Sequence, residues 1–170
     1  MIIDISPLLS GKQNKLDFDL EGQIEDEILQ DQICFTAPVR VNGEITNQAG
    51  YMEIVMDVGY SYEVACDRCS LPIVREGSLR IEKGIASVHQ VDEEENDRYL
   101  LYDGTALVLD TAIADQIYLS LPYRNLCRED CRGYCTGCGT NLNEGQCSCQ
   151  KKTVDPRLAV LQKLLEDQNE

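Results

Sequence analysis

The 170-residue sequence contains no tryptophan, two phenylalanines and one histidine. Aliphatic side chains and eight tyrosines must therefore fill its core. The single histidine, His89, disfavours nucleophilic catalysis, because a cysteine nucleophile usually needs a histidine base. A lone histidine near the end of a strand is more often structural or exposed than a metal ligand, so His89 receives no functional assignment.

Basic residues are scarce. Fifteen Lys and Arg stand against 30 Asp and Glu, which gives a net charge of -15. This balance disfavours nucleic-acid binding over the whole surface, since phosphate binding depends on lysine and arginine. It favours basic partners without excluding a local RNA contact. Residues 1–31 and 91–97 are the most acidic segments, and we interpret them as solvated surface or, alternatively, as docking sites for a basic partner.

Targeting and membrane signals are also missing. The opening residues MIIDISPLLSGKQ have no basic region, no long apolar region and no small-residue cleavage site, so we expect no signal peptide. No apolar run approaches the ~18 residues of a membrane helix. We therefore expect a cytoplasmic protein, with reduced thiols and no membrane partner.

The pattern of residues 33–86 predicts β-strands. Segments 33–45, 51–66 and 73–86 are rich in Val, Ile and Tyr and alternate in places between apolar and polar residues. Asn42-Gly43 and 48–50 are predicted turns, and Asp103-Gly104 is the predicted turn of a short hairpin. We expect an antiparallel sheet, possibly curled into a partial barrel.

Two helices are predicted. One covers about 111–121, with Asp110 or Thr111 as its N-cap and Pro122 at its end. The other follows Asp155-Pro156 and has an apolar leucine stripe, which packs on its own domain or against a partner helix. The predicted fold is α+β: a β-rich core domain (1–126), a cysteine-rich zinc-ribbon-like metal-binding module packed on it (127–152), and a C-terminal amphipathic helix (153–170).

Six of the nine cysteines lie between residues 127 and 149. Cys135-x-x-Cys138-Gly has the spacing of a zinc knuckle, and Cys147-x-Cys149 supplies two further sulfurs for a closed tetrahedral site. Cys66-x-x-Cys69 lies at the end of a predicted strand. Together with the remaining Cys127 and Cys131, it gives a second set of four cysteines. We predict two structural zinc sites, although the cysteines could be divided between them differently. Cys34 would be a free thiol, buried in a strand.

Other chemistries for these cysteines remain open. Cys66 and Cys69 could form a redox dithiol, but no following amphipathic helix supports a thioredoxin-like context. The spacings do not match the usual iron–sulfur run. Four thiolates leave a zinc ion no open position, so such sites are structural and not catalytic. Basic residues around the module could screen the thiolates or contact RNA: Arg124, Arg128, Arg132, Lys151 and Lys152.

The CDRC at a strand end, the run LCREDCRGYCTGCGTNLNEGQCSC after an LP pair, and DPRLAVLQKL resemble the YceD family of large ribosomal RNA subunit accumulation proteins, most closely its Gram-positive branch. Thr136 stands where that branch would have proline. The resemblance implies a non-enzymatic role in accumulation or processing of large-subunit rRNA. It implies as partners the rRNA precursor, a basic large-subunit ribosomal protein, or both. Other branches lack most of the distal cysteines, which implies that the 135–149 site is a stabilising elaboration. The alternatives are a metal- or redox-responsive thiol protein using Cys66 and Cys69, or an adaptor that binds protein only.

Overall fold

The structure, a computed structural model, describes residues 1–89, 91 and 98–149. The predicted C-terminal helix, most of the acidic segment 91–97, Lys151 and Lys152 lie outside these residues.

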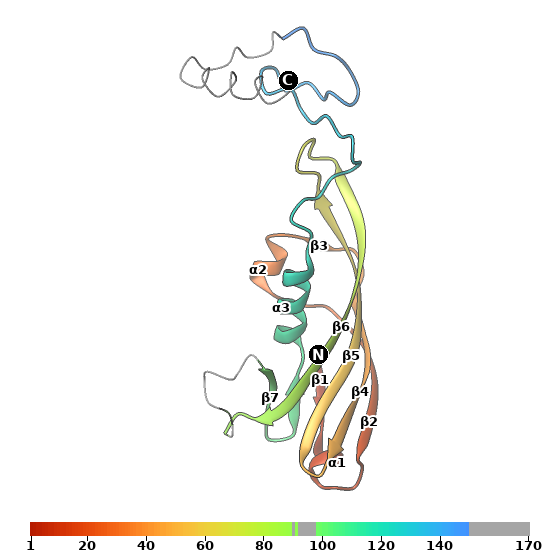
Figure 1. Cartoon of the computed structure of the whole chain (residues 1–170), viewed down its shortest axis with the longest axis vertical. Helices are drawn as coiled ribbons and strands as arrows, with labels where there is room; N and C mark the ends of the chain where they lie inside the picture. The colour runs from red at the N-terminus through yellow and green to blue at the C-terminus, as the bar shows by residue number, and fades with distance from the viewer. Residues whose placement is uncertain (90, 92–97, 150–170) are drawn as a thin grey trace, which may run out of the picture.

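The fold is a curled, mostly antiparallel sheet with short helices (Figure 1). Its elements are β1 (Ile2–Asp4), α1 (Ser6–Leu9), β2 (Lys15–Gly22), α2 (Glu27–Gln30), β3 (Cys34–Phe35), β4 (Val39–Gln48), β5 (Tyr51–Ala65), β6 (Pro72–Ser87), β7 (Tyr99–Asp103), β8 (Ala106–Val108) and α3 (Asp110–Ser120). The strand order is β1-β8-β7-β6-β5-β4-β2, with β3 added to β5. Among the paired strands of the described chain, β6 and β7 alone run parallel. The predicted antiparallel, partly barrel-like α+β fold is confirmed.

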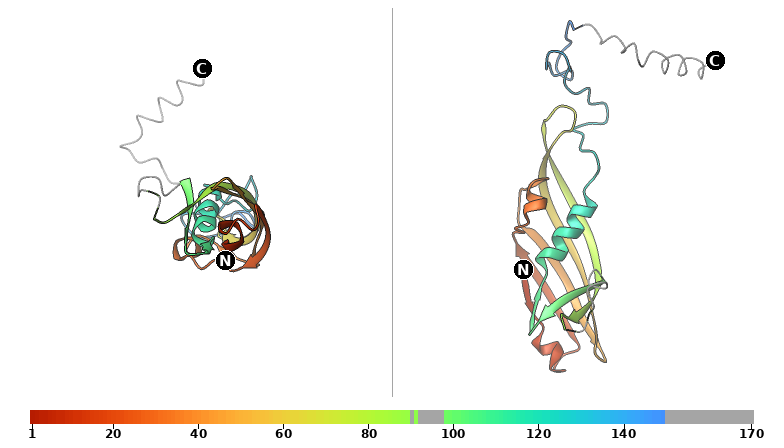
Figure 2. Two further views of the ribbon diagram at one scale, coloured as in Figure 1. Left: turned by 90° about the horizontal axis from the view of Figure 1, so that it is seen from below. Right: turned by 90° about the vertical axis from the view of Figure 1, so that its left-hand side faces the viewer.

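Alternation along the long strands builds the core. Every second residue of β5, from Met52 to Tyr62, is buried, so one face of the strand is apolar. The sheet curls around α3, as the view along the long axis shows (Figure 2). Ile113 and Ile117 of α3 are fully buried in the same cluster. The N-cap of α3 is Leu109, so the predicted cap, Asp110 or Thr111, was one or two residues late. The Asp110 carboxylate instead accepts a hydrogen bond from the N-terminal amine.

The predicted turns have different outcomes. The turn after Gln48 joins β4 to β5, with Ala49 and Gly50 at positive φ, and Asp103-Gly104 forms the β7–β8 hairpin. The predicted turn at Asn42-Gly43 is wrong, because both residues lie inside β4. Gly43 is needed there for another reason, since a Cβ would lie 2.3 Å from the Val55 carbonyl oxygen.

The longest hairpin carries the first cysteine pair away from the core. β5 and β6 remain paired from Met52–Ile85 to Ala65–Pro72, and residues 66–71 form the tip. The segment after α3 returns to this tip and continues into the cysteine-rich module (Figure 1). Within the described residues, no helix has both the length and the apolar character needed to cross a membrane.

Candidate metal centres

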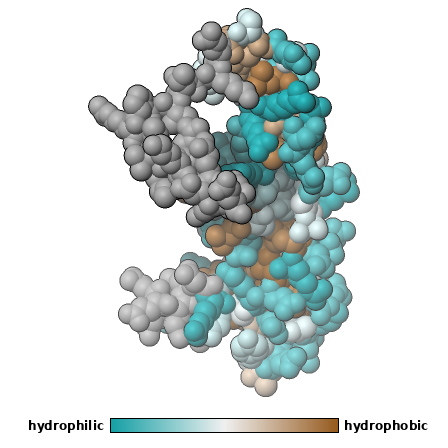
Figure 3. Space-filling view, turned by 45° about the horizontal axis from the view of Figure 1, so that its top comes forward, coloured by the Kyte–Doolittle hydropathy of each residue, from teal (hydrophilic) through white to brown (hydrophobic). Residues whose placement is uncertain are grey.

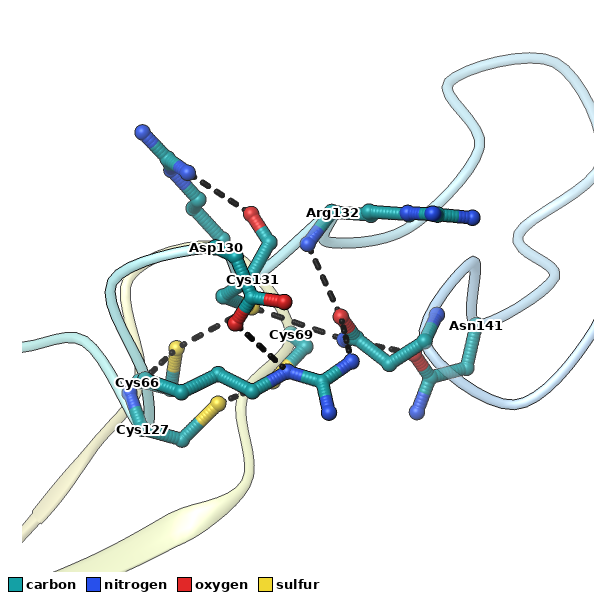
Figure 4. Close-up of polar contacts among 10 residues, drawn as sticks. Cys66, Cys69, Cys127, Asp130, Cys131, Arg132 and Asn141 are labelled. Carbon is teal, nitrogen blue, oxygen red and sulfur yellow. Dashed lines mark hydrogen bonds and ion pairs between the residues drawn. The ribbon is translucent and has the colours of Figure 1, made fainter.

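The inner site consists of Cys66, Cys69, Cys127 and Cys131, and it forms where the hairpin tip meets the segment after α3 (Figure 4). The four sulfurs lie within 4.8 Å of one another. The Cys66–Cys131 sulfur distance is 3.9 Å and the Cys69–Cys127 distance is 3.6 Å. A tetrahedron with Zn–S bonds of ~2.3 Å has edges of about 3.8 Å. The inner site therefore has the dimensions of a four-thiolate metal centre.

The hairpin tip places its two cysteines on the same side. Cys66 accepts a backbone hydrogen bond from Ser70 (2.8 Å) and donates one to Leu71 (2.9 Å). Ser70 closes the turn at a φ of 52°. Cys66 and Cys69 are 2% and 3% exposed. The tip thus presents two buried sulfurs toward the segment that follows α3.

Hydrogen bonds of both backbone and side chains hold this segment against the tip. Asp67 N–H donates to the Asn125 carbonyl (2.8 Å), and Asn125 N–H donates to the Asp67 carboxylate (2.7 Å). The Arg68 guanidinium donates to the Cys131 carbonyl (2.6 Å), and the Arg68 carbonyl accepts from Tyr134 N–H (3.1 Å). These contacts join parts of the chain that lie far apart in sequence and bring the two cysteine pairs together.

Gly133 allows the segment to lie close to the Arg68 carbonyl. Its φ is +69°, and a Cβ would lie 2.7 Å from the Arg68 carbonyl oxygen. A side chain would therefore be strained by its backbone conformation and would also collide with the hairpin tip.

The outer site consists of Cys135, Cys138, Cys147 and Cys149, whose sulfurs also lie within 4.8 Å of one another. Its first pair sits on a knuckle in which Gly139 N–H donates to the Cys135 carbonyl (2.9 Å) and Gly137 N–H donates to the Cys135 sulfur (3.4 Å). Cys138 and Cys149 are exposed, unlike the inner cysteines. The structure thus has one buried and one open four-cysteine group, divided as the spacing predicted.

In the inner site the thiols divide into two kinds by acidity. Burial opposes ionisation of Cys66, but backbone hydrogen bonds from Arg68, Cys127 and Cys69 outweigh it and lower the pKa of Cys66 to about 6. Burial, reinforced by the neighbouring sulfurs, raises the pKa of Cys127 to about 12. The four thiols therefore do not all ionise by themselves. A metal cation bound at the centre would supply the positive charge that four thiolates need.

The outer site has the same division. A hydrogen bond with the Thr140 hydroxyl lowers the pKa of Cys138 to about 6, and a hydrogen bond with Cys138 raises the pKa of Cys149 to about 12. Both groups are thus positioned to bind a metal ion.

The remaining predicted residues lie outside these groups. Cys34 is exposed in β3, so the prediction of a buried thiol is wrong, because β3 pairs for only two residues at the side of β5. His89 is exposed after β6. Arg124, Arg128 and Arg132 are all exposed close to the inner cysteines in sequence, and Arg128 pairs with Asp130 at 3.3 Å.

Two contributors to the inner site were not predicted. Arg68 lies between the two hairpin cysteines and binds the opposite segment through both its side chain and its carbonyl. Asn143 donates to the Cys131 sulfur at 3.4 Å. In the sequence it belongs to NLNEG, which indicates only a turn, so no local signal could assign it to a site.

Comparison with known proteins gives the family. A profile described as "Large ribosomal RNA subunit accumulation protein YceD" matches residues 54–165, which include both cysteine groups. The chain belongs to the YceD family. The family match confirms the resemblance inferred from the cysteine run.

Individual relatives match over shorter lengths. An uncharacterized protein of Mycobacterium leprae is 39% identical over 80 residues, covering 45% of this chain and 36% of its own. A maize protein named "Large ribosomal RNA subunit accumulation protein YCED homolog 1, chloroplastic" is 22% identical over 147 residues, covering 69% of this chain and 50% of its own. An uncharacterized protein of Mycobacterium tuberculosis is 30% identical over 103 residues, covering 59% and 49%. The chain thus spans half or less of the length of these relatives. No solved structure matches it significantly.

Proposed function

We propose that this protein is a non-enzymatic factor in biogenesis of the large ribosomal subunit, which supports accumulation or processing of large-subunit rRNA. The observation that carries the proposal is the inner site, which lies within the family-matched region and joins the hairpin tip to the distal cysteine segment. Four buried or half-buried thiolates suit a structural Zn²⁺ ion and leave it no open position for a substrate. The proposed role of both metals is therefore to hold the fold.

The outward side of the sheet favours a basic protein as the direct partner. Directly opposed residues share a sheet face, so the strand register defines an acidic sheet face on β2, β4, β5 and β6. Its acids are Asp17, Asp19, Glu21, Glu44, Glu53, Asp57, Glu63, Glu76 and Glu82. Three cations share the face, and each already lies within 4.0 Å of one of these acids: Lys15, Arg40 and Arg80. The face keeps a negative excess, which attracts basic surfaces.

RNA contact by the arginines is less favoured. Arg128 is engaged by Asp130 and by Asn143, and each four-thiolate zinc site would add two negative charges beside the patch. Hydrophilic side chains cover much of the described surface that faces the viewer in Figure 3. Arg124 and Arg132 are exposed and remain candidates for a local phosphate contact. We therefore place a basic large-subunit ribosomal protein first and the rRNA precursor second.

A redox function at Cys66 and Cys69 has less support. Both sulfurs are buried against Cys127 and Cys131, whereas an exchanging thiol needs access to its substrate. None of the nine cysteines forms a disulfide, which suits a reducing compartment such as the cytoplasm.

Capture of the tagged protein from its own cells, with and without RNase, tests the proposal. The test variant is Asp17→Asn/Asp19→Asn/Glu21→Gln on the acidic sheet face. The control, Glu25→Gln/Asp103→Asn/Asp115→Asn, removes the same charge from exposed acids elsewhere. A basic large-subunit ribosomal protein should remain bound after RNase to the wild type and the control, and should be lost from the test variant.

Other outcomes identify the competing functions. In one such outcome, large-subunit rRNA is captured by both the wild type and the test variant and is lost on RNase treatment. That result would favour direct RNA binding by the arginines. Retention of neither ribosomal RNA nor ribosomal protein would overturn the ribosomal role.

A further inference from the structure

Asn143 connects the two metal centres. It lies in the turn between Cys138 and Cys147, so the outer-site ligands flank it on both sides. Its side chain, however, forms hydrogen bonds with Arg128, Cys131 and Arg132 of the inner-site segment. Asn143 therefore lies between outer-site ligands in the sequence, but its side chain contacts the inner site.

The Asn143 amide is used at both ends. Its Nδ2 donates to the Cys131 sulfur at 3.4 Å and to Asn141 Oδ1 at 2.9 Å. Its Oδ1 accepts from Arg132 N–H at 2.8 Å and from the Arg128 guanidinium at 2.9 Å. The carbonyl thus fixes the backbone next to Cys131, while the amide nitrogen points at the sulfur itself.

The turn that carries Asn143 is anchored at its base. Asn143 N–H donates to Asn141 Oδ1 at 3.1 Å, and Asn141 forms an antiparallel bridge with Tyr134. Leu142 N–H donates to the Gly133 carbonyl at 2.9 Å. Residues 133–135 in turn lead from Cys131 directly into the outer knuckle. A displacement of the turn would therefore move the Asn143 amide away from the inner sulfur.

Metal at the outer site would restrict this turn. Joining Cys138 to Cys147 closes the short loop that contains Asn143, and closure removes conformational freedom from it. Partners of a metal ligand orient it and commonly change metal affinity by 10–100-fold. We propose that Asn143 positions Cys131 as an inner-site ligand, and that metal bound at the outer site, by holding the turn, strengthens metal binding at the inner site. Linkage makes this effect reciprocal.

A simpler role for Asn143, as a turn former alone, predicts a different response to Asn143→Asp. Aspartate has almost the same shape and keeps an oxygen for Arg132 N–H and Arg128. It loses the hydrogen bonds that Nδ2 donates to the Cys131 sulfur and to Asn141 Oδ1, while the backbone N–H at position 143 still donates to Asn141 Oδ1 and holds the turn. A turn-forming residue would tolerate this change, whereas a positioning residue would not. Asn42→Asp, on the exposed side of β4, adds the same charge away from both sites and serves as the control.

The experiment follows each site separately in full-length protein loaded with ¹¹³Cd²⁺. The two four-thiolate centres should give two NMR resonances, and Cys138→Ser/Cys149→Ser, the outer-site variant, assigns them by removing one. A chelator titration then gives the cadmium affinity of each site in the wild type, in Asn143→Asp, in the outer-site variant and in their combination. The outer resonance retained in Asn143→Asp verifies that the module still folds.

We expect Asn143→Asp to lower the inner-site affinity about 10–100-fold relative to Asn42→Asp. The outer-site variant should also lower it, and adding Asn143→Asp to that variant should have a smaller effect than in the wild type. If Asn143→Asp left the cadmium affinity of the inner site unchanged, the positioning role would be overturned. If Asn143→Asp lowered that affinity by the same factor in the wild type and in the outer-site variant, the coupling would be overturned. The inference rests on the proposed metal binding. Absence of both resonances would refute metal binding itself, and intact resonances with no effect of Asn143→Asp would refute this inference alone.

Discussion

Metal binding should release fewer protons than eight ordinary thiols would. The thiolate is the metal-binding form of cysteine, so each thiol that is still protonated must lose its proton when the metal arrives. At the ordinary pKa of 9.0, nearly all eight thiols would be protonated at about pH 7.5. Each site would then release close to four protons. The structure predicts a smaller number.

In the inner site, Cys66 has a pKa of about 6 and is already ionised at about pH 7.5. Burial raises the pKa of Cys127 to about 12, so it holds its proton. The backbone N–H of Leu71 lowers the pKa of Cys69, but burial and the hydrogen bonds with Cys66 and Cys131 together outweigh it, so the pKa of Cys69 is raised. The pKa of Cys131 is lowered, because hydrogen bonds led by that from Asn143 outweigh burial. Two to three protons should therefore leave per metal ion.

The outer site should release a similar number. Its thiols show the same division, lowered for Cys135 and Cys138 and raised for Cys147 and Cys149. Because protons compete with the metal, affinity at both sites should rise with pH. The logarithm of the apparent affinity should rise by about two to three per pH unit above pH 6 and more steeply below it, where Cys66 and Cys138 also become protonated.

Calorimetric titration of reduced, metal-free protein with Zn²⁺ measures this count. The titration is repeated at about pH 7.5 in buffers that differ in ionisation enthalpy, and the slope of observed heat against that enthalpy gives the protons released. Two to three per zinc ion agrees with the division of the thiols. A value close to four would refute it, because it would mean that the hydrogen bonds around Cys66 and Cys138 do not stabilise their thiolates.

Three further predictions concern the packing and exposure of single residues. Gly133→Ala should weaken zinc binding at the inner site about tenfold or more, because a left-handed backbone conformation costs a residue with a side chain ~1–2 kcal/mol and the Cβ would also collide with the Arg68 carbonyl. The control is Gly104→Ala, at a φ of +61° with open space around it, which should leave the zinc affinity unchanged. In the zinc-loaded protein, Cys34 alone should react rapidly with a thiol reagent, and the other eight cysteines should react only after the zinc is chelated. Rapid reaction of several cysteines before chelation would contradict metal binding. Ile113→Ala should lower the free energy of unfolding by about 2–5 kcal/mol in denaturant titrations, and a loss below about 1 kcal/mol would show that α3 does not fill the sheet.

Both four-cysteine groups could be predicted from the sequence, the outer one from the local spacing of its knuckle and the inner one by counting the remaining cysteines. Cys135 and Cys138 lie on one turn, so their spacing identifies a site without tertiary information. The pairing of Cys66 and Cys69 with the distal cysteines followed only from counting the four sulfurs that remained. The structure supplies its physical basis, which is the backbone contact between the hairpin tip and the segment after α3.

The errors arose where distant strands decide the local structure. Gly43 follows an asparagine and has the sequence of a turn, but its missing side chain makes room for the Val55 carbonyl of the next strand. Cys34 stands in an apolar run, yet β3 is too short to be covered. The parallel pairing of β6 with β7 depends on a return of the chain that no periodicity encodes. The division at residue 126 and the C-terminal helix remain predictions.

Metal bound at the two four-cysteine groups would restrain different lengths of chain. The inner site joins Cys66 to Cys131, 65 residues apart, whereas the outer site joins cysteines on neighbouring turns. Closing a 65-residue loop instead of one of about nine residues costs roughly 1.8 kcal/mol more chain entropy, so metal at the inner site constrains the unfolded chain more strongly. The apolar residues beside the inner site are few, chiefly Ile73 and Leu126, and could not hold the tip by burial alone. Loss of the inner metal should therefore release the module from the sheet, while loss of the outer metal should leave the hairpin tip joined to the segment after α3.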